Sequence, residues 1–114
     1  MGNKQDDMGV VPLDAPLGAE IVGIDLSEPL LDDTIHRILQ AWYDHVVIFF
    51  RDQKLSNRNL VAVAEYFGEP EHSPPNKSGN TWLAEFPELT CISNIKKDGR
   101  PIGSLGNGEA IWHT

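Results

Sequence analysis

The residue with the clearest capacity for chemistry in this chain is His113, in the final run Ile111–Thr114. The β-branched and aromatic residues before it predict a short strand entering at residue 111, after a Gly-rich loop at 103–108. Imidazole is the commonest metal-binding side chain. A single histidine beside a tryptophan is also typical of a packed or half-exposed structural residue. The four residues alone leave both interpretations open.

Two further polar side chains are candidates for contact with a small molecule. His72 lies in the Pro-rich segment 69–80, which predicts an irregular loop on the surface or over a site. Asn94 is near the end of a predicted strand at 90–95, and its amide can hydrogen-bond a polar substrate. A solvated loop histidine and a turn asparagine are the alternatives. The two histidines expected to be structural, one facing solvent and one in a turn, are His36 and His45.

Two segments with helical periodicity are expected to support these residues. Residues 32–44 predict an amphipathic helix, with Asp32 or Asp33 as a cap. Residues 56–67 predict a second helix, for which Ser56 is a favourable N-cap. The apolar stripe expected to face the core in the first helix consists of Ile35, Ile38, Leu39 and Trp42.

Apolar runs predict the strands. The mixed pattern of residues 19–25 indicates a strand covered on much of both faces, and the continuous run 46–50 indicates a buried strand. After the predicted strand at 90–95, the pair Asp98-Gly99 is typical of a type I′ hairpin turn. Pro101 limits the returning strand to an edge or a short piece.

Length and composition restrict the class of protein. The chain has 114 residues, 40% of them hydrophobic and 23% charged, which fits at most one globular domain, preceded by a flexible tail at residues 1–9. The net charge of -8 argues against nucleic acid or an anionic membrane as a partner. Cys91, expected to be buried, is the single cysteine and fits a reducing compartment. We therefore expect a cytoplasmic protein.

The order of these blocks resembles the taurine dioxygenase-like (TauD/TfdA) family of Fe(II)- and 2-oxoglutarate-dependent dioxygenases. The segments similar to that family are Pro16–Leu26, Val46–Ser56, Ala64–Glu69 and Trp112–Thr114. The last of them is similar to the opening of the family's Trp-His-x-Asp motif. Each segment is weak alone, but their order over about residues 10–114 is specific.

The resemblance implies an α+β or mainly β protein, the N-terminal part of one double-stranded β-helix (jelly-roll) domain. It implies an enzyme that uses Fe(II), 2-oxoglutarate and O₂ to oxidise a small molecule, with decarboxylation of 2-oxoglutarate to succinate. His113 is then the first ligand of a site with two histidines and one carboxylate. The other ligands and the 2-oxoglutarate-binding residues are expected beyond Thr114, so the chain would end within the His-x-Asp motif. His72, offset by about one residue from a substrate-contacting histidine of the family, and Asn94 are expected on the substrate side.

Two alternatives stay open. One is a non-catalytic binding domain that kept this part of the fold, and the other is a related desaturase or halogenase. Halogenases of the wider superfamily lack the carboxylate ligand, so the residue after Thr114 distinguishes them. The 114-residue chain alone is expected to be inactive and to associate through exposed apolar surface. The expected partners are a small-molecule substrate and O₂, with homo-oligomerisation left open.

Overall fold

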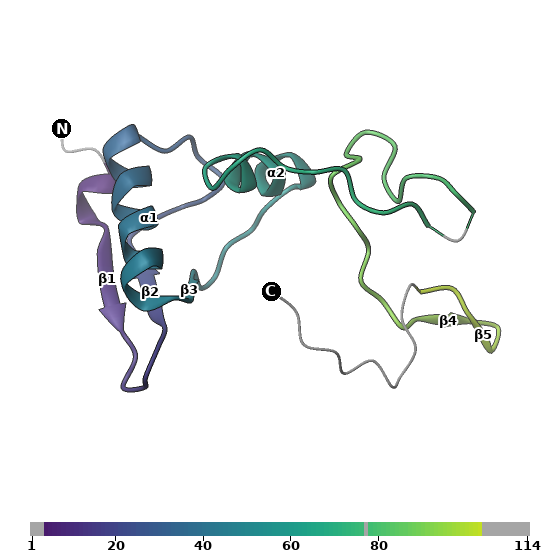
Figure 1. The fold of residues 1–114 in the computed structure, drawn as a ribbon, viewed down its shortest axis with the longest axis horizontal. Helices are drawn as coiled ribbons and strands as arrows, with labels where there is room; N and C mark the ends of the chain where they lie inside the picture. Colours follow the sequence, from purple (N-terminus) through teal and green to yellow (C-terminus); the bar gives the residue numbers. More distant parts are fainter. Residues whose placement is uncertain (1–3, 77, 104–114) are drawn as a thin grey trace. The chain divides into compact units, whose positions relative to one another are not determined.

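Two compact units divide the chain, Met1–Glu69 and Pro70–Thr114, and the computed structural model describes residues 4–76 and 78–103 (Figure 1). The first unit combines a three-stranded sheet with two helices, in the order β1, β2, α1, β3, α2. The second unit contains the hairpin β4-β5 in its described part. The α+β composition predicted from the sequence is confirmed for these residues. None of the described helices is long and apolar enough to cross a membrane.

The sheet of the first unit has the order β1-β2-β3, with β1 at Gly9–Pro12, β2 at Ala19–Val22 and β3 at Ile48–Phe49. β1 and β2 pair antiparallel, whereas β2 and β3 pair parallel. Parallel neighbours need a crossover connection, and helix α1 (Asp32–His45) provides it (Figure 1). The helix therefore contacts β2 and β3 and covers one side of the sheet.

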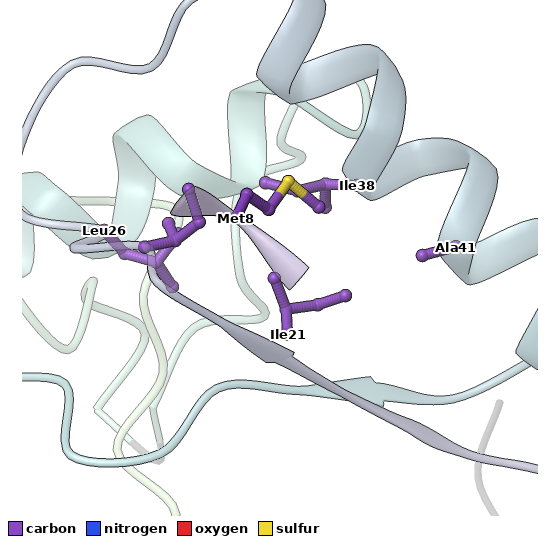
Figure 2. Close-up of a cluster of buried hydrophobic side chains, with 6 residues drawn as sticks. Met8, Ile21, Leu26, Ile38 and Ala41 are labelled. Atoms are coloured by element: carbon purple, nitrogen blue, oxygen red, sulfur yellow. The ribbon is translucent and has the colours of Figure 1, made fainter. Parts of the chain in front are cut away.

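The core lies between α1 and this side of the sheet (Figure 2). On the helix, Thr34, Ile38 and Ala41 are buried, at the spacing i, i+4 and i+7. They meet the inward side chains of β2, where Ile21 is 3% exposed. The stripe predicted from the sequence was partly wrong, because Trp42 is 39% exposed. Compared with the predicted stripe, the buried face of the helix is shifted toward Thr34 and Ala41. These small side chains allow the helix to pack closely on the strand.

Met8 belongs to this core, whereas the sequence predicted a flexible tail over residues 1–9. Lys4–Asp7 form a 3-10 turn, and the following Met8 is 5% exposed within the core cluster (Figure 2). The guanidinium of Arg37 donates from Nη2 to the Met8 carbonyl at 2.9 Å. A buried methionine and a bonded backbone carbonyl hold this segment against the helix.

The start of α1 is fixed by a distant glutamine. The prediction that Asp32 or Asp33 caps the helix was wrong, since the N-cap residue is Leu31 and no side-chain bond caps it. Instead, Gln5 accepts the Leu31 N–H at 2.8 Å and donates to the Pro29 carbonyl at 2.8 Å. The two aspartates still lie in the first turn, where negative charge is favoured by the helix dipole.

The end of α1 shortens the strand that was predicted at residues 46–50. Val46 has φ 70° and ψ −43°, and the Val47 N–H donates to the His45 carbonyl at 2.8 Å, which makes a γ-turn. The same carbonyl accepts the Gly18 N–H at 2.8 Å, so the turn is tied to the start of β2. The strand begins only at Ile48. Val46 is 62% exposed rather than buried.

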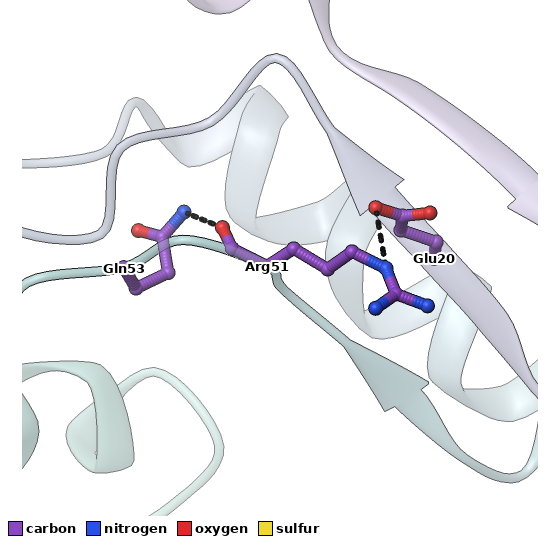
Figure 3. Close-up of polar contacts among 3 residues, drawn as sticks. All are labelled: Glu20, Arg51 and Gln53. Atoms are coloured by element: carbon purple, nitrogen blue, oxygen red, sulfur yellow. Dashed lines mark hydrogen bonds and ion pairs between the residues drawn. The ribbon is translucent and has the colours of Figure 1, made fainter.

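Among the described residues, the sheet side away from α1 is only partly covered, whereas the sequence predicted cover on much of both faces of β2. Side chains alternate along a strand, and Val22 on the outward side is 37% exposed. Beside it, Glu20 Oε1 lies 3.3 Å from Arg51 Nε (Figure 3). The Arg51 guanidinium also lies 5.1 Å from the ring centroid of Phe49, the neighbour of Glu20 on β3. A charge pair and an aromatic ring thus occupy this surface.

Gln53 joins the segments that follow β2 and β3. Its Nε2 donates to the Ile24 carbonyl at 3.0 Å. The same nitrogen donates to the Arg51 carbonyl at 3.1 Å (Figure 3). Its Oε1 accepts the Leu26 N–H at 2.8 Å. The side-chain amide therefore makes the hydrogen bonds to Ile24 and Leu26 that a backbone peptide group would make if β3 continued.

Helix α2 (Asn57–Glu65) confirms the second helix prediction and its cap. Ser56 Oγ accepts the Asn59 N–H at 3.1 Å, and Asn59 Oδ1 accepts the Ser56 N–H at 3.0 Å, which forms a capping box. Just after the helix, the Phe67 ring meets Trp42 of α1 edge to face, with centroids 5.5 Å apart.

In the second unit, β4 (Lys96–Lys97) and β5 (Arg100–Pro101) form the hairpin predicted from Asp98-Gly99. Both central residues have positive φ, 51° and 75°, as a type I′ turn requires. The strand predicted at 90–95 was wrong, because pairing begins only at Lys96. Within residues 4–76 and 78–103, no strand pairs with residues 90–95, and an apolar run forms a strand only where a partner strand pairs with it. The strand predicted to enter at 111 lies outside the described residues.

Candidate functional site

The residue predicted to bind iron, His113, lies outside the described residues, so its role stays a prediction. The two predicted substrate-side residues, His72 and Asn94, both lie in the second unit and are exposed. They occupy different segments, His72 at the base of a loop and Asn94 shortly before β4. Their exposure agrees with either a ligand-contacting or a solvated role.

His72 directly precedes a loop that is closed by Ser73. The Ser73 N–H donates to the Pro87 carbonyl at 2.9 Å, and its hydroxyl lies 3.0 Å from the same oxygen. The hydroxyl also lies 3.1 Å from the Leu89 carbonyl. The chain entering the loop is thereby held against the chain leaving it, directly beside His72.

Inside this loop, Asn76 organises a tight turn. Its N–H donates to the Asn80 carbonyl at 2.8 Å, and its own carbonyl accepts the Gly79 N–H at 2.9 Å. Its Oδ1 accepts the Ser78 N–H at 2.9 Å and the Asn80 N–H at 3.2 Å. Asparagine is suited to such turns because its side chain satisfies nearby backbone donors.

Asn94 is set between a serine turn and a close backbone approach. Ser93 Oγ accepts the Ile95 N–H at 3.1 Å, which bends the chain around Asn94. The Ile95 carbonyl accepts the N–H groups of Ile102 at 2.9 Å and Gly103 at 3.2 Å. A Cβ on Gly103 would overlap the Ser93 carbonyl and would lie 2.9 Å from the Asn94 nitrogen. Only glycine fits this approach without a shift of the backbone.

No group of three or more His, Cys, Asp or Glu side chains suited to a metal ion occurs within residues 4–76 and 78–103. These residues therefore do not fit an iron site by themselves. His36 is exposed, as predicted, and His45 is the turn residue whose carbonyl joins α1 to β2. Cys91 was predicted to be buried but is exposed, because the strand expected around it does not form.

Ser73 and Gly103 are the site-supporting residues that the sequence analysis missed. Ser73 stands between a histidine and two prolines, where nothing local indicates a partner 14 residues away. Gly103 shortly follows Pro101 and was interpreted as the first residue of a flexible loop. A glycine that closely follows a predicted hairpin is nevertheless a signal for close backbone approach.

Comparison with known proteins defines the class. The profile described as "Taurine catabolism dioxygenase TauD, TfdA family" matches residues 9–114. The chain belongs to this family, as the resemblance predicted from the ordered sequence segments.

Individual relatives agree with that assignment. The chain is 39% identical over 103 residues to pentalenolactone F synthase of Streptomyces avermitilis, covering 86% of this chain and 32% of the relative. It is 33% identical over 91 residues to (S)-phenoxypropionate/alpha-ketoglutarate-dioxygenase of Sphingobium herbicidovorans, covering 79% and 26%. Among solved structures, a taurine dioxygenase from Burkholderia xenovorans aligns with a TM-score of 0.60 at 32% identity, covering 70% and 27%. The chain thus spans about a third or less of the length of these relatives.

Proposed function

We propose that this chain is part of an Fe(II)- and 2-oxoglutarate-dependent dioxygenase that oxidises a C–H bond of a small molecule. In that reaction 2-oxoglutarate is decarboxylated to succinate. The observation that carries the proposal is the family match over residues 9–114, which includes His113. Relatives named as alpha-ketoglutarate dioxygenases support the same chemistry. The proposed fold of the whole protein is the double-stranded β-helix.

The roles proposed for individual residues follow the family pattern. His113 is one iron ligand, and its remaining partners belong to parts of the protein outside these 114 residues. Bound Fe(II) would supply the redox chemistry with O₂. His72 and Asn94 are proposed to bind the polar group of the substrate, since an imidazole and a primary amide can each donate a hydrogen bond.

The substrate is proposed to be a small organic acid. Two of the relatives carry names of such molecules, one a phenoxypropionate and one taurine. Hydrogen-bond donors at positions 72 and 94 are compatible with a carboxylate or sulfonate group. Candidate substrates for an assay are therefore phenoxyalkanoates and alkylsulfonates.

The test uses the full-length parent protein, with Fe(II), ascorbate, 2-oxoglutarate and the candidate acids. We expect succinate release from the parent and its loss in His113→Ala, with an unchanged circular dichroism spectrum. Loss of one imidazole ligand is expected to remove the metal site and to leave the fold, which the circular dichroism spectrum reports. Near-normal turnover in His113→Ala would disprove the ligand assignment.

A further inference from the structure

The segment from Ser73 to Leu89 is a loop whose ends are joined by one short side chain. Ser73 and Pro87 are 14 residues apart, and Ser73 and Leu89 are 16 apart. The turns inside the loop are local: Asn76 bonds within its own turn, and the Leu89 N–H donates to Phe86 at 3.0 Å. The bonds of Ser73 therefore act over a much longer range than these turns.

The Ser73 hydroxyl contributes something that its backbone cannot. The backbone N–H already donates to the Pro87 carbonyl at 2.9 Å. The single hydroxyl proton is shared between the Pro87 and Leu89 carbonyls, at 3.0 and 3.1 Å. The bond to the Leu89 carbonyl is a second attachment point, two residues beyond Pro87. With two attachment points, the two ends of the loop cannot pivot about the single Ser73–Pro87 bond. The part-buried position of these bonds limits competition from water.

His72 is the residue next to this closure. Because Ser73 is held at both its nitrogen and its hydroxyl, the direction in which the chain passes through His72 is restrained as well. Within residues 4–76 and 78–103, no hydrogen bond or ion pair fixes the exposed imidazole independently. The backbone direction at residue 72 sets which rotamers the exposed imidazole can adopt and where they point.

We propose that Ser73 is a positioning residue for substrate binding: its hydroxyl closes the 73–89 loop and thereby orients His72. This inference rests on the proposed function, in which His72 contacts the substrate. Ser73 acts through its neighbour and does not touch the reacting atoms. Its contribution falls on substrate affinity, because orientation of a binding group is required before the chemical step.

The test compares Ser73→Ala, Ser73→Thr and the control Ser78→Ala in the full-length parent. Ser78 lies in the same loop and is exposed, and its backbone N–H, which the substitution keeps, makes the turn bond. We expect Ser73→Ala to raise KM for a phenoxyalkanoate or alkylsulfonate roughly fivefold with little change in kcat, the scale of one net hydrogen bond. Ser73→Thr keeps the hydroxyl and is expected to restore KM, and Ser78→Ala to leave it unchanged.

A double-mutant cycle with His72→Ala separates positioning from general structure. If Ser73 acts through His72, the Ser73→Ala change has no further effect on KM in the His72→Ala background. Three outcomes would each overturn the assignment. In Ser73→Ala, kcat could fall by as large a factor as KM rises. The effects of Ser73→Ala and His72→Ala on KM could be additive, or Ser78→Ala could raise KM as much as Ser73→Ala does.

A second measurement distinguishes failure of this inference from failure of the proposed function. Amide hydrogen exchange within residues 73–89 of the parent is expected to quicken in Ser73→Ala and not in Ser73→Thr. Unchanged exchange in Ser73→Ala would overturn the loop closure, whatever the activity. A parent that releases no succinate but shows the faster exchange would reject the proposed function, and with it the role in binding, while keeping the closure.

Discussion

The two units of this chain are held together by different interactions. In Met1–Glu69, side chains from the N-terminal turn, β2 and α1 share a buried core. In the described part of Pro70–Thr114, the apolar side chains of Ile92, Ile95 and Ile102 are 72%, 60% and 56% exposed. There the chain is shaped by hydrogen bonds from small side chains to backbone groups. The first unit is therefore a packed scaffold, whereas the described part of the second unit consists of segments whose side chains are exposed.

This division places both substrate-side candidates outside the packed scaffold. Regions with few buried apolar contacts open more readily than a core. Their geometry then depends on individual polar links such as that of Ser73, whereas the geometry of the core depends on many contacts together. Single substitutions should accordingly affect global stability in the first unit and local geometry in the second.

The sharpest test of this contrast is the same substitution in both units. Ile21 is 3% exposed and Ile92 is 72% exposed. We expect Ile21→Ala to lower the free energy of unfolding by about 2–5 kcal/mol, through lost burial and the cavity that remains. Ile92→Ala should change it by less than about 0.5 kcal/mol. Urea unfolding followed by circular dichroism measures the free energy of unfolding of both variants. Similar decreases in the two variants would show that Ile92 contributes as much to stability as a core residue of the first unit.

A smaller effect is expected from glycine substitutions around the hairpin. In Gly103→Ala the new Cβ would overlap the Ser93 carbonyl, and backbone must shift, at a cost of about 1–3 kcal/mol. In Gly99→Ala nothing lies within 4 Å, and only the φ of 75° is unfavourable, at about 1 kcal/mol. Amide exchange at Ile102, which bonds the Ile95 carbonyl, reports on both variants. Exchange no faster in Gly103→Ala than in Gly99→Ala would argue against the close approach.

The sequence predicted those elements whose signals are local. The helices followed from apolar side chains three and four residues apart, the α2 cap from Ser56, and the hairpin from Asp98-Gly99. Each depends on residues within one or two turns of chain. The same physics explains the confirmed shortness of β5, since Pro101 has no N–H to extend the ladder.

The failures involve partners that are distant along the chain. Nothing near Leu31 indicates that its N–H is bonded by Gln5, 26 residues earlier. The closure of the His72 loop likewise depends on Pro87, which is 14 residues from Ser73. His72 was predicted in an irregular loop and Asn94 near the end of a strand, but the hydrogen bonds that support the two segments were not predicted.

Apolar runs were the other source of error. Residues 46–50 were predicted as buried because a continuous apolar run usually needs cover on both sides. The γ-turn at the end of α1 uses two of these residues, and Val47 is 48% exposed. The prediction that the isolated chain associates through such surface stays a prediction.

The smallest effect is expected at Val46, and it has the opposite sign. A β-branched residue with φ 70° is strained, because its Cβ crowds the backbone in this region. The 62% exposure of the side chain means that little packing is lost on its removal. Val46→Gly should therefore raise the free energy of unfolding by about 1 kcal/mol, after allowance for the greater entropy of glycine in the unfolded chain. Val47→Gly, next to it without positive φ, is the matched control and should lower stability. A loss of stability in Val46→Gly equal to that in Val47→Gly would show that the turn stores no strain and that the Val46 side chain contributes to packing of the first unit.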